Sequence, residues 1–510
     1  MDVLLSAVVG DLFGRSASFV INRYFQRQPG IDMILQRLER VVLRIDTVVE
    51  EAEGRHITNQ GMLRQLKMLR QGMYRGHYVL DALTFQAPDD EEEEEEEVSH
   101  SSSALTNVTP AKRLRFSQAG SSTSNREELL FGVNSNVREE LQRLVDTLED
   151  TMAGMKEFLF FLESYPRILR QPYGTYLILD NCMFGRQSER QRVLDFLLRP
   201  SAAPDLAVLP IVGPIRVGKT TLVEHICRDE SVRDRFSMIL FFPEGSLKDE
   251  GVIDLKGENI NGLVKHRDCA SSNMLLIIVE IGEDINKEAW RRLKSSTTRM
   301  TPRGGSKIII TSRSGRIVNL GTTETLRLDY LPPEAYCHFF KSIAFGSTNP
   351  NEHPKLATMA MEIALEQRQC FTGAHLVAGI LRDNFNARFW RTILECVRAY
   401  KQTNLLMFEK HPNLRLREDE PVYYWRLAKS RRYFLICNYH PSDSSSEEVP
   451  KISVRDILLG CTLPHGEFEA LAWRSRIPPY YNYTISCKMQ APEPKVGRKK
   501  RMPQDEGHLS

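Results

Sequence analysis

The sequence lacks the patterns that mark a disulfide-rich, metal-binding or membrane-spanning protein. Its nine cysteines are scattered among 510 residues without a CxxC pair, which is typical of reduced thiols and not of a disulfide framework or a zinc site. No apolar run is long enough to span a membrane. The net charge of +2 argues against direct binding of nucleic acid by the whole surface. The first residues carry no recognisable secretory signal, so we expect a cytoplasmic protein.

Residues 1–85 carry the apolar spacing of amphipathic helices. Apolar residues recur every three or four positions in stretches that begin near Leu4, Ile31 and Leu63. Helices of this kind bury their apolar stripes against one another, and we predict a small coiled-coil-type α-helical bundle. Three short helices bury a limited core. For that reason we expect this segment to self-associate or to pair with related helical domains.

Residues 86–130 have the composition of a disordered linker. Asp89 to Glu97 is an unbroken acidic run, and a Ser-rich stretch follows it. Such a segment cannot bury enough apolar surface to fold. One basic cluster lies inside it at 110–115, and a second lies at 495–501 in a predicted disordered basic tail, 491–510. Either cluster is explained by nuclear import or by ordinary solvated charge, so a nuclear location stays open.

Strands begin to alternate with helices after the linker. A helical connector is predicted for 131–175, an α/β domain for 176–330 and a helical subdomain for 331–400. Short apolar runs supply the predicted strands, at 208–212, 238–242, 275–279 and 307–311. This alternation predicts a parallel sheet covered on both faces, with a ligand at the carboxyl ends of the strands. Residues 401–490 are less regular and remain unassigned.

A phosphate-binding loop follows the first of these strands. The sequence Gly-x-x-x-x-Gly-Lys-Thr lies between an apolar run and a helical pattern. Its glycines let backbone N–H groups surround phosphates, and the helix N-terminus adds a positive partial charge. Lys219 is placed to reach the β-phosphate of ADP or the β- and γ-phosphates of ATP, and the Thr220 hydroxyl to bind Mg²⁺. The alternative is a glycine-rich turn without a ligand. The predicted nucleotide contacts in the loop are Gly213, Val217, Gly218, Lys219, Thr220 and Thr221.

The residues that a phosphate loop needs as partners are only partly present. The usual metal ligand is an Asp at the end of a neighbouring apolar strand. In the run 275–281 the first acid is Glu280, which is the candidate catalytic carboxylate. Because Glu is one methylene longer than Asp, we expect Mg²⁺ binding to be weakened and ATP hydrolysis to be weak at most. Arg313 follows another strand, where its cation is placed to sense a γ-phosphate.

The order of these motifs resembles the NB-ARC nucleotide switch of plant disease-resistance proteins of the coiled-coil class. Phe184-Gly185-Arg186 resembles the family's first motif, which contacts the base and ribose of the nucleotide. The loop 213–221 is similar to the family's phosphate loop, and 305–313 to a later strand motif. Val279 and Glu280 occupy the places of two family acids. The resemblance therefore implies that the magnesium-binding Asp is lost.

Other segments depart from the family. The family's Gly-Leu-Pro-Leu-Ala segment is represented by Cys370 to Ala374 without the proline that packs on adenine, and neither a Met-His-Asp motif nor leucine-rich repeats are evident. The resemblance implies an ARC1-like subdomain at 331–400. It also implies a truncated ADP/ATP switch of plant defence that acts as a helper, adaptor or decoy and pairs with related NB-ARC proteins through its N-terminal helices. Two alternatives remain: an active NTPase, and an interaction protein whose loop is vestigial.

Overall fold

The chain forms two compact units in the computed structural model, one of residues 1–53 and 68–164 and one of residues 54–67 and 165–510. The predicted helix at Leu4, the acidic linker up to residue 123 and both basic clusters lie outside the described residues. The structure describes residues 29–84, 124–167, 183–200, 206–242, 264–265, 274–282, 287–300, 305–367, 370–418, 420–424, 433–442, 450–462, 464–475, 480 and 482–490.

The first unit is helical, as the apolar spacing predicts. Its core consists of the stripes that recur every three or four residues, and in α3 these include Leu38, Val42 and Ile45. Helix α3 packs against α5, and the predicted N-terminal bundle is confirmed for the described residues. The helices that contribute to this unit are α3 (Pro29–Glu53), α4 (Gln60–Thr84), α5 (Ser124–Ala153) and α6 (Lys156–Leu162).

Two glycines one turn apart in α4 allow the helices of this bundle to approach closely. A Cβ atom at Gly76 would lie 2.3 Å from Cγ2 of Val42 in α3. A Cβ atom at Gly72 would lie 2.8 Å from Cδ2 of Leu148 in α5. Both distances are shorter than real carbon contacts, so a side chain at either position would force the facing residue to move.

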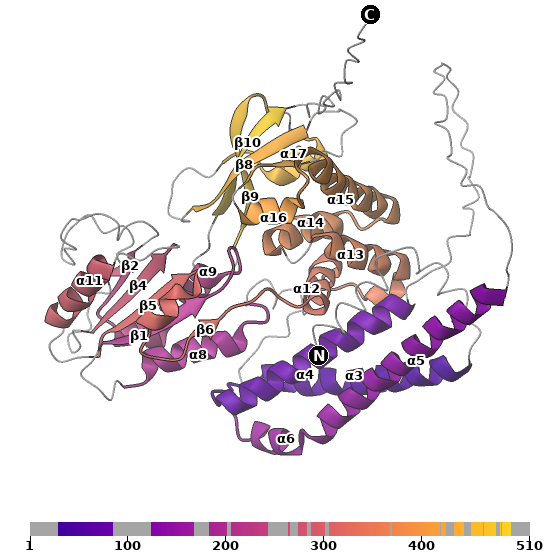
Figure 1. Cartoon of the computed structure of the whole chain (residues 1–510), viewed down its shortest axis with the longest axis horizontal. Coiled ribbons are helices and arrows are strands. Elements are labelled where there is room, and N and C mark those ends of the chain that lie inside the picture. Colours follow the sequence, from indigo (N-terminus) through magenta and orange to yellow (C-terminus); the bar gives the residue numbers. More distant parts are fainter. Residues whose placement is uncertain are drawn as a thin grey trace, which may run out of the picture. The chain divides into compact units, whose positions relative to one another are not determined.

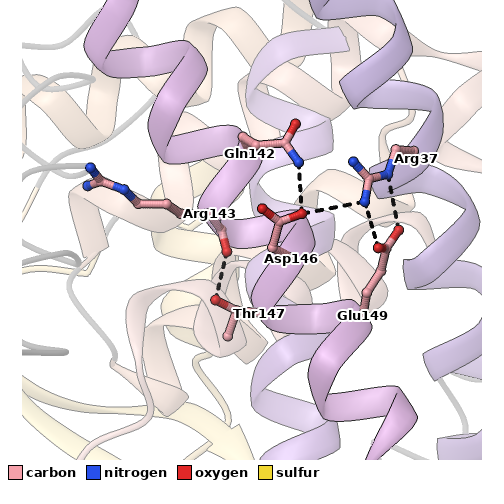
Figure 2. Close-up of polar contacts among 6 residues, drawn as sticks. All are labelled: Arg37, Gln142, Arg143, Asp146, Thr147 and Glu149. Atoms are coloured by element: carbon pink, nitrogen blue, oxygen red, sulfur yellow. Dashed lines mark hydrogen bonds and ion pairs between the residues drawn. The ribbon is translucent and has the colours of Figure 1, made fainter.

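An arginine connects the polar faces of α3 and α5 (Figure 2). Arg37 donates to both carboxylate oxygens of Glu149, from Nε at 3.2 Å and from a terminal nitrogen at 2.6 Å. It also donates to Oδ1 of Asp146 at 3.4 Å, which in turn accepts from Gln142 at 2.8 Å. The two carboxylates raise the pKa of the Arg37 guanidinium. Because the pair is exposed to solvent, it contributes more to the register of the two helices than to stability.

The second unit contains a six-stranded sheet of order β3-β2-β4-β5-β1-β6, in which only β3 is antiparallel to its neighbour. The predicted parallel α/β fold is confirmed. The strands are β1 (Ala207–Val212), β2 (Met238–Phe242), β3 (Val264–Lys265), β4 (Leu275–Ile281), β5 (Lys307–Ser312) and β6 (Leu326–Arg327).

Helices cover both faces of this sheet (Figure 1). Leu276 and Ile278 of β4 belong to the core on one face, and Leu275 and Val279 to the core on the other. One face packs against α8 (Gln187–Leu198), α9 (Lys219–Cys227) and α10 (Glu230–Arg235). The other packs against α11 (Lys287–Met300) and the 3₁₀ helix η1 (Gly315–Leu320). Side chains alternate between faces along a strand, and this alternation decides which residues reach the phosphate loop.

A helical subdomain follows the sheet. Helix α12 packs against α13 and α14, and α13 also packs against α15. Trp390 of α15 is fully buried, and its indole N–H donates to the carbonyl oxygens of Leu381 at 3.0 Å and Asn384 at 3.1 Å. The elements are α12 (Pro333–Phe345), the 3₁₀ helix η2 (Pro350–Glu352), α13 (Pro354–Gln367), α14 (Phe371–Asp383), α15 (Ala387–Phe408) and α16 (Pro412–Arg417).

The region without a predicted fold contains a second sheet, antiparallel, of order β7-β8-β10-β9. Its apolar core includes Ile436, Ile457 and Ile485, and Leu376 of α14 packs against this core. The C-terminal sheet, which is the name used below, therefore forms a continuous core with the helical subdomain. Its elements are β7 (Val422–Tyr424), β8 (Tyr433–Ser442), α17 (Val454–Leu459), β9 (Glu467–Arg474) and β10 (Asn482–Gln490).

Candidate functional site

The phosphate loop connects β1 to α9 at the carboxyl end of the parallel sheet. Gly213 leaves β1 against the backbone that follows β6, where a Cβ atom would lie only 2.3 Å from the carbonyl oxygen of Leu328. Gly218 begins α9 with a φ of 91°, a left-handed conformation that favours glycine. Nothing lies within 4 Å of a Cβ atom built at Gly218. The first glycine is therefore required for packing, and the second borders open space at the helix N-terminus.

The loop backbone is held by two side chains. Lys219 Nζ donates to the carbonyl oxygens of Gly213 at 2.9 Å and Pro214 at 2.8 Å. The Tyr330 hydroxyl donates to the carbonyl oxygen of Ile215 at 2.8 Å. The carbonyl groups of three successive loop residues thus accept hydrogen bonds from side chains of the protein itself.

The residue after these carbonyls carries strain. Arg216 has a φ of 58°, which is unfavourable for a residue with a side chain. Backbone strain of this kind persists where the surrounding contacts fix the conformation, and it is concentrated at ligand sites. Val217, the next residue, is 2% exposed and anchors the loop in the sheet core.

The acid of β4 that faces the loop is Glu280. The Thr220 hydroxyl donates a hydrogen bond to Oε1 of Glu280. Val279 lies on the opposite face, fully buried in the core formed with α11. The sheet register therefore places the candidate carboxylate of Glu280 against the loop hydroxyl and Val279 away from it.

The end of β5 lies at the same carboxyl edge of the sheet as the phosphate loop. The backbone N–H of Gly213 donates to the carbonyl oxygen of Ser312 at 3.2 Å. The Ser312 hydroxyl donates to the carbonyl oxygen of Gly282, after β4, at 2.8 Å. These bonds connect the carboxyl ends of β1, β4 and β5. Arg313 follows directly and is exposed, which places its cation at this edge.

Phe184, Gly185 and Arg186 lie at the start of α8 and pack against the segment after β6. Phe184 is 8% exposed, and its ring contacts that of Phe339 of α12 at an interplanar angle of 35°, with centroids 5.0 Å apart. Gly185 has a φ of 69° and passes close to Leu331. Arg186 donates to the carbonyl oxygen of Asp329 at 2.5 Å, and burial lowers the pKa of its guanidinium. In this structure these residues connect the α/β domain to the segment that precedes α12.

The loop residues fit a nucleotide with Mg²⁺. A nine-residue helix presents its N-terminus to the open space beside Gly218, and such a helix end attracts phosphate. Magnesium is bound in proteins by one or two oxygen side chains together with phosphate oxygens and water, and Thr220 and Glu280 supply two oxygens. Among the described residues no group of three His, Cys, Asp or Glu side chains could hold a metal without such help.

Sequence reasoning brought together the loop, Glu280 and the end of β5, but it missed Tyr330 as a loop contact. Tyr330 follows the short strand β6, and its hydroxyl donates to the carbonyl oxygen of Ile215, which is 115 residues away in the chain. No local pattern in the sequence connects this tyrosine to the loop.

The sheet order, the glycine-bracketed loop and the helix that starts at Lys219 define a P-loop nucleotide-binding domain. The chain is 23% identical over 474 residues to the disease resistance RPP13-like protein 1 of Arabidopsis thaliana, covering 88% of this chain and 42% of that protein. It is 22% identical over 437 residues to the disease resistance protein RGA2 of Solanum bulbocastanum, covering 82% of this chain and 41% of that protein. These similarities confirm the resemblance to plant NB-ARC disease-resistance proteins.

The chain spans about two fifths of the length of these two relatives. No family model matches the sequence. A solved structure titled "Structure of Drosophila ORC bound to DNA" aligns with 47% of this chain and 78% of that chain, at 11% identity and a TM-score of 0.26. No helix in the described part of the chain is long and apolar enough to cross a bilayer.

Proposed function

We propose that the chain is an ADP/ATP-binding regulatory switch in plant defence signalling, acting in the cytoplasm as a helper, adaptor or decoy. The observation that supports it best is the loop itself. Lys219, Thr220 and Glu280 converge beside the open space at Gly218, in a chain related to NB-ARC disease-resistance proteins. In such a switch the phosphates of the nucleotide stabilise one of two arrangements of the domains. Nucleotide binding therefore determines which arrangement is present.

The direct test is to identify the nucleotide that accompanies the purified protein and to titrate the emptied protein with ADP. Lys219→Ala removes a cation from the loop, and we expect the affinity for ADP to fall by roughly tenfold or more, since a charge-assisted contact is worth about 1.5–3 kcal/mol. Lys287→Ala, at an exposed lysine of α11, is the matched control and should leave the affinity unchanged. Equal affinity of the Lys219→Ala and wild-type proteins would contradict the proposal.

The same experiment separates the alternatives. Co-purified ADP with slow turnover favours the switch, while turnover near the enzyme median of about 10 s⁻¹ would favour an active NTPase. A protein that neither contains nor binds nucleotide would favour an interaction protein with a vestigial loop. Glu280 is the residue that we assign to any weak hydrolysis, because its carboxylate contacts the Thr220 hydroxyl.

The proposal includes pairing through the N-terminal helices, with a second copy or with related NB-ARC proteins. Large apolar side chains remain exposed on this unit, among them Met33 at 67% and Leu43 at 65% on α3. Sedimentation of the whole chain across a concentration series tests self-association, with Leu43→Glu as the disrupting variant and Thr47→Glu as its exposed control. A wild-type chain that stays monomeric at high micromolar concentration would leave only unlike partners.

A further inference from the structure

Segment 328–331, which follows β6, holds the phosphate loop from one side. The backbone N–H of Leu328 donates to the carbonyl oxygen of the last residue of β1 at 2.8 Å. The Tyr330 hydroxyl donates to the carbonyl oxygen of Ile215, also at 2.8 Å. Neither contact reaches Gly218, where a built Cβ atom has no neighbour within 4 Å among the described residues. The phosphate end of the site is therefore held in place and open.

The two other residues of this segment hold Gly185 and Arg186, which the resemblance assigns to the base and ribose of a nucleotide. The Arg186 guanidinium donates to the carbonyl oxygen of Asp329 at 2.5 Å, and the arginine is only 7% exposed. A Cβ atom at Gly185 would lie 2.9 Å from Cδ2 of Leu331, so this side chain lies directly against the glycine. Both motif residues are thus engaged in contacts within the protein.

Phe184, the remaining residue of this motif, is enclosed by other rings. Its ring centroid lies 5.0 Å from that of Phe339 and 6.4 Å from that of His338, which is nearly parallel to it at 17°. Phe339 is 2% exposed and meets the Phe371 ring edge-on, at 5.4 Å and 75°. Phe371 is the first residue of α14, in the segment 370–374 that lacks the adenine-packing proline. Because protein interiors are close-packed, a base could stack among these rings only if one of them moved away.

The two ends of the site therefore differ in what they can accept. Phosphates are bound by backbone N–H groups at a helix N-terminus and by a cation, and Lys219 supplies that cation at the first position of α9. Binding there requires no change in the core. The motif expected to contact the base is already filled by side chains of the protein.

We infer that the site selects its ligand by the phosphates and not by the base, so that its ligand class is any nucleoside diphosphate or triphosphate. The inference rests on the proposed function, because it concerns the same loop, and it makes ADP and ATP two members of a wider class. Specificity is a difference between two binding free energies, and a base without its own contacts contributes little to that difference. A site built to hydrogen-bond one base would instead reject the others by orders of magnitude.

The test is a titration of the whole chain, freed of nucleotide, with ADP, GDP and CDP in the presence of Mg²⁺. We expect the three affinities to agree within about fivefold, which is the net effect of a single hydrogen bond. Pyrophosphate has no base, and it should displace ADP at no more than about tenfold higher concentration. Adenosine, which has the base and no phosphate, is the matched control ligand and should not displace ADP. A larger preference for ADP, or displacement of ADP by adenosine, would overturn the inference.

Arg186→Ala tests the motif itself. If the arginine contacts only the protein, the ratio of the affinities for ADP and pyrophosphate should stay at its wild-type value. The melting temperature should fall, because the Asp329 carbonyl loses its donor. Arg192→Ala, on the same helix with Glu324 as its partner at 3.0 Å, is the control for the loss of a positive charge.

A selective loss of ADP affinity relative to pyrophosphate in Arg186→Ala would show that this arginine contacts the nucleoside, and it would overturn the inference. The ligand series with the wild-type protein requires no variant. It gives its answer whether or not Arg186→Ala folds.

The outcomes also distinguish this inference from the proposed function. If Lys219→Ala weakens ADP binding and the wild-type protein prefers ADP to GDP and CDP by more than about fivefold, the loop binds nucleotide and the inference is wrong. If the wild-type protein binds none of the nucleotides, both proposals fail. If Lys219→Ala weakens the binding of all three diphosphates alike, in a protein without a preference among bases, both are supported.

Discussion

The hydroxyl of Thr220 donates a hydrogen bond to the carboxylate of Glu280. Thr220 belongs to the phosphate loop and Glu280 to the sixth position of the seven-residue strand β4, two segments that are 60 residues apart in the chain. A Mg²⁺ ion that binds between the protein and the phosphates of a nucleotide needs a carboxylate close to the loop hydroxyl. The contact explains how the site can retain a metal ligand although the preceding position is Val279.

Removing the charge of Glu280 should abolish the effect of Mg²⁺ on nucleotide binding. In the wild-type protein we expect Mg²⁺ to raise the affinity for ATP, and in Glu280→Gln we expect the ratio of affinities with and without Mg²⁺ to approach one. Glutamine keeps the shape of the side chain and lacks the charge that holds the ion. Titrations with and without a chelator measure the ratio. Glu288→Gln, exposed on α11, should behave as the wild type, and an unchanged ratio in Glu280→Gln would exclude this residue as a ligand.

Introducing an acid at Val279 should damage the fold and should not restore a metal site. Val279 is fully buried in the apolar core against α11. An unpaired carboxylate there should cost at least about 3 kcal/mol of the free energy of unfolding, whereas Val279→Ala should cost about 2 kcal/mol. Urea unfolding of the three proteins gives both values. A Val279→Asp protein of wild-type stability with stronger Mg²⁺ dependence would show that the register of β4 differs from the one described.

Alanine substitutions at the two loop glycines should have different effects, one mainly on stability and the other mainly on ADP binding. Gly213→Ala places a Cβ atom against the Leu328 carbonyl, and we expect a loss of about 1–3 kcal/mol in stability. Gly218→Ala enters open space at a φ of 91°, so we expect a smaller loss, of about 1 kcal/mol, with at least roughly tenfold weaker ADP binding. Thermal unfolding and ADP titration measure the two effects. Gly315→Ala, also in open space, should change neither.

Much of the α/β domain could be predicted because its signals are local. The loop sequence, the helix after Lys219 and the apolar runs that became β1, β2, β4 and β5 are each contained in nine or fewer consecutive residues. Spacing and composition are sufficient for such segments. These local segments were sufficient to predict the nucleotide-binding fold.

The parts that could not be predicted depend on alternation and on distant contacts. The sequence gives Glu280 as the candidate carboxylate but does not say which face of its strand it occupies. The pleat of β4 decides this, because it directs Glu280 to the loop and Val279 to the opposite core. The C-terminal sheet was missed because β8 and β9 are joined by a long connection that contains α17, and β8 pairs with β10 and not with β9. Tyr330 reaches the Ile215 carbonyl, 115 residues away in the chain, through tertiary packing that no local pattern encodes.

The stability of the protein should depend on pH through Lys307, at the start of β5. Its ammonium group donates to the carbonyl oxygens of Phe196 and of Arg199, at 2.6 Å, where α8 ends. Burial, with the nearby charge of Arg235, lowers the pKa of Lys307 to about 8. Between this value and the unfolded value of about 10.4 the unfolded chain binds more protons, so this residue's contribution to stability rises with pH.

Lys307→Met should remove this rise. We expect the difference in the free energy of unfolding between wild type and variant to shift in favour of the wild type from pH 7 to pH 10, in denaturant titrations at both values. Lys287→Met, at an exposed lysine, provides the control for the loss of a charge. A difference that is constant with pH would show that Lys307 does not titrate in this range.

Replacing a helical glycine by alanine should have opposite effects at Gly76 and Gly379. Alanine stabilises the interior of a helix by about 1 kcal/mol relative to glycine. At Gly379, in α14, nothing lies within 4 Å of the new Cβ atom, so Gly379→Ala should raise the melting temperature. At Gly76 the new atom would lie 2.3 Å from Val42, and overpacking of about 1–3 kcal/mol should outweigh the gain. In Gly76→Ala with Val42→Ala the clash is relieved, and the double variant should lose less stability than the sum of the single changes. Additive losses would mean that α3 and α4 are not packed as closely as the distance between Gly76 and Val42 indicates.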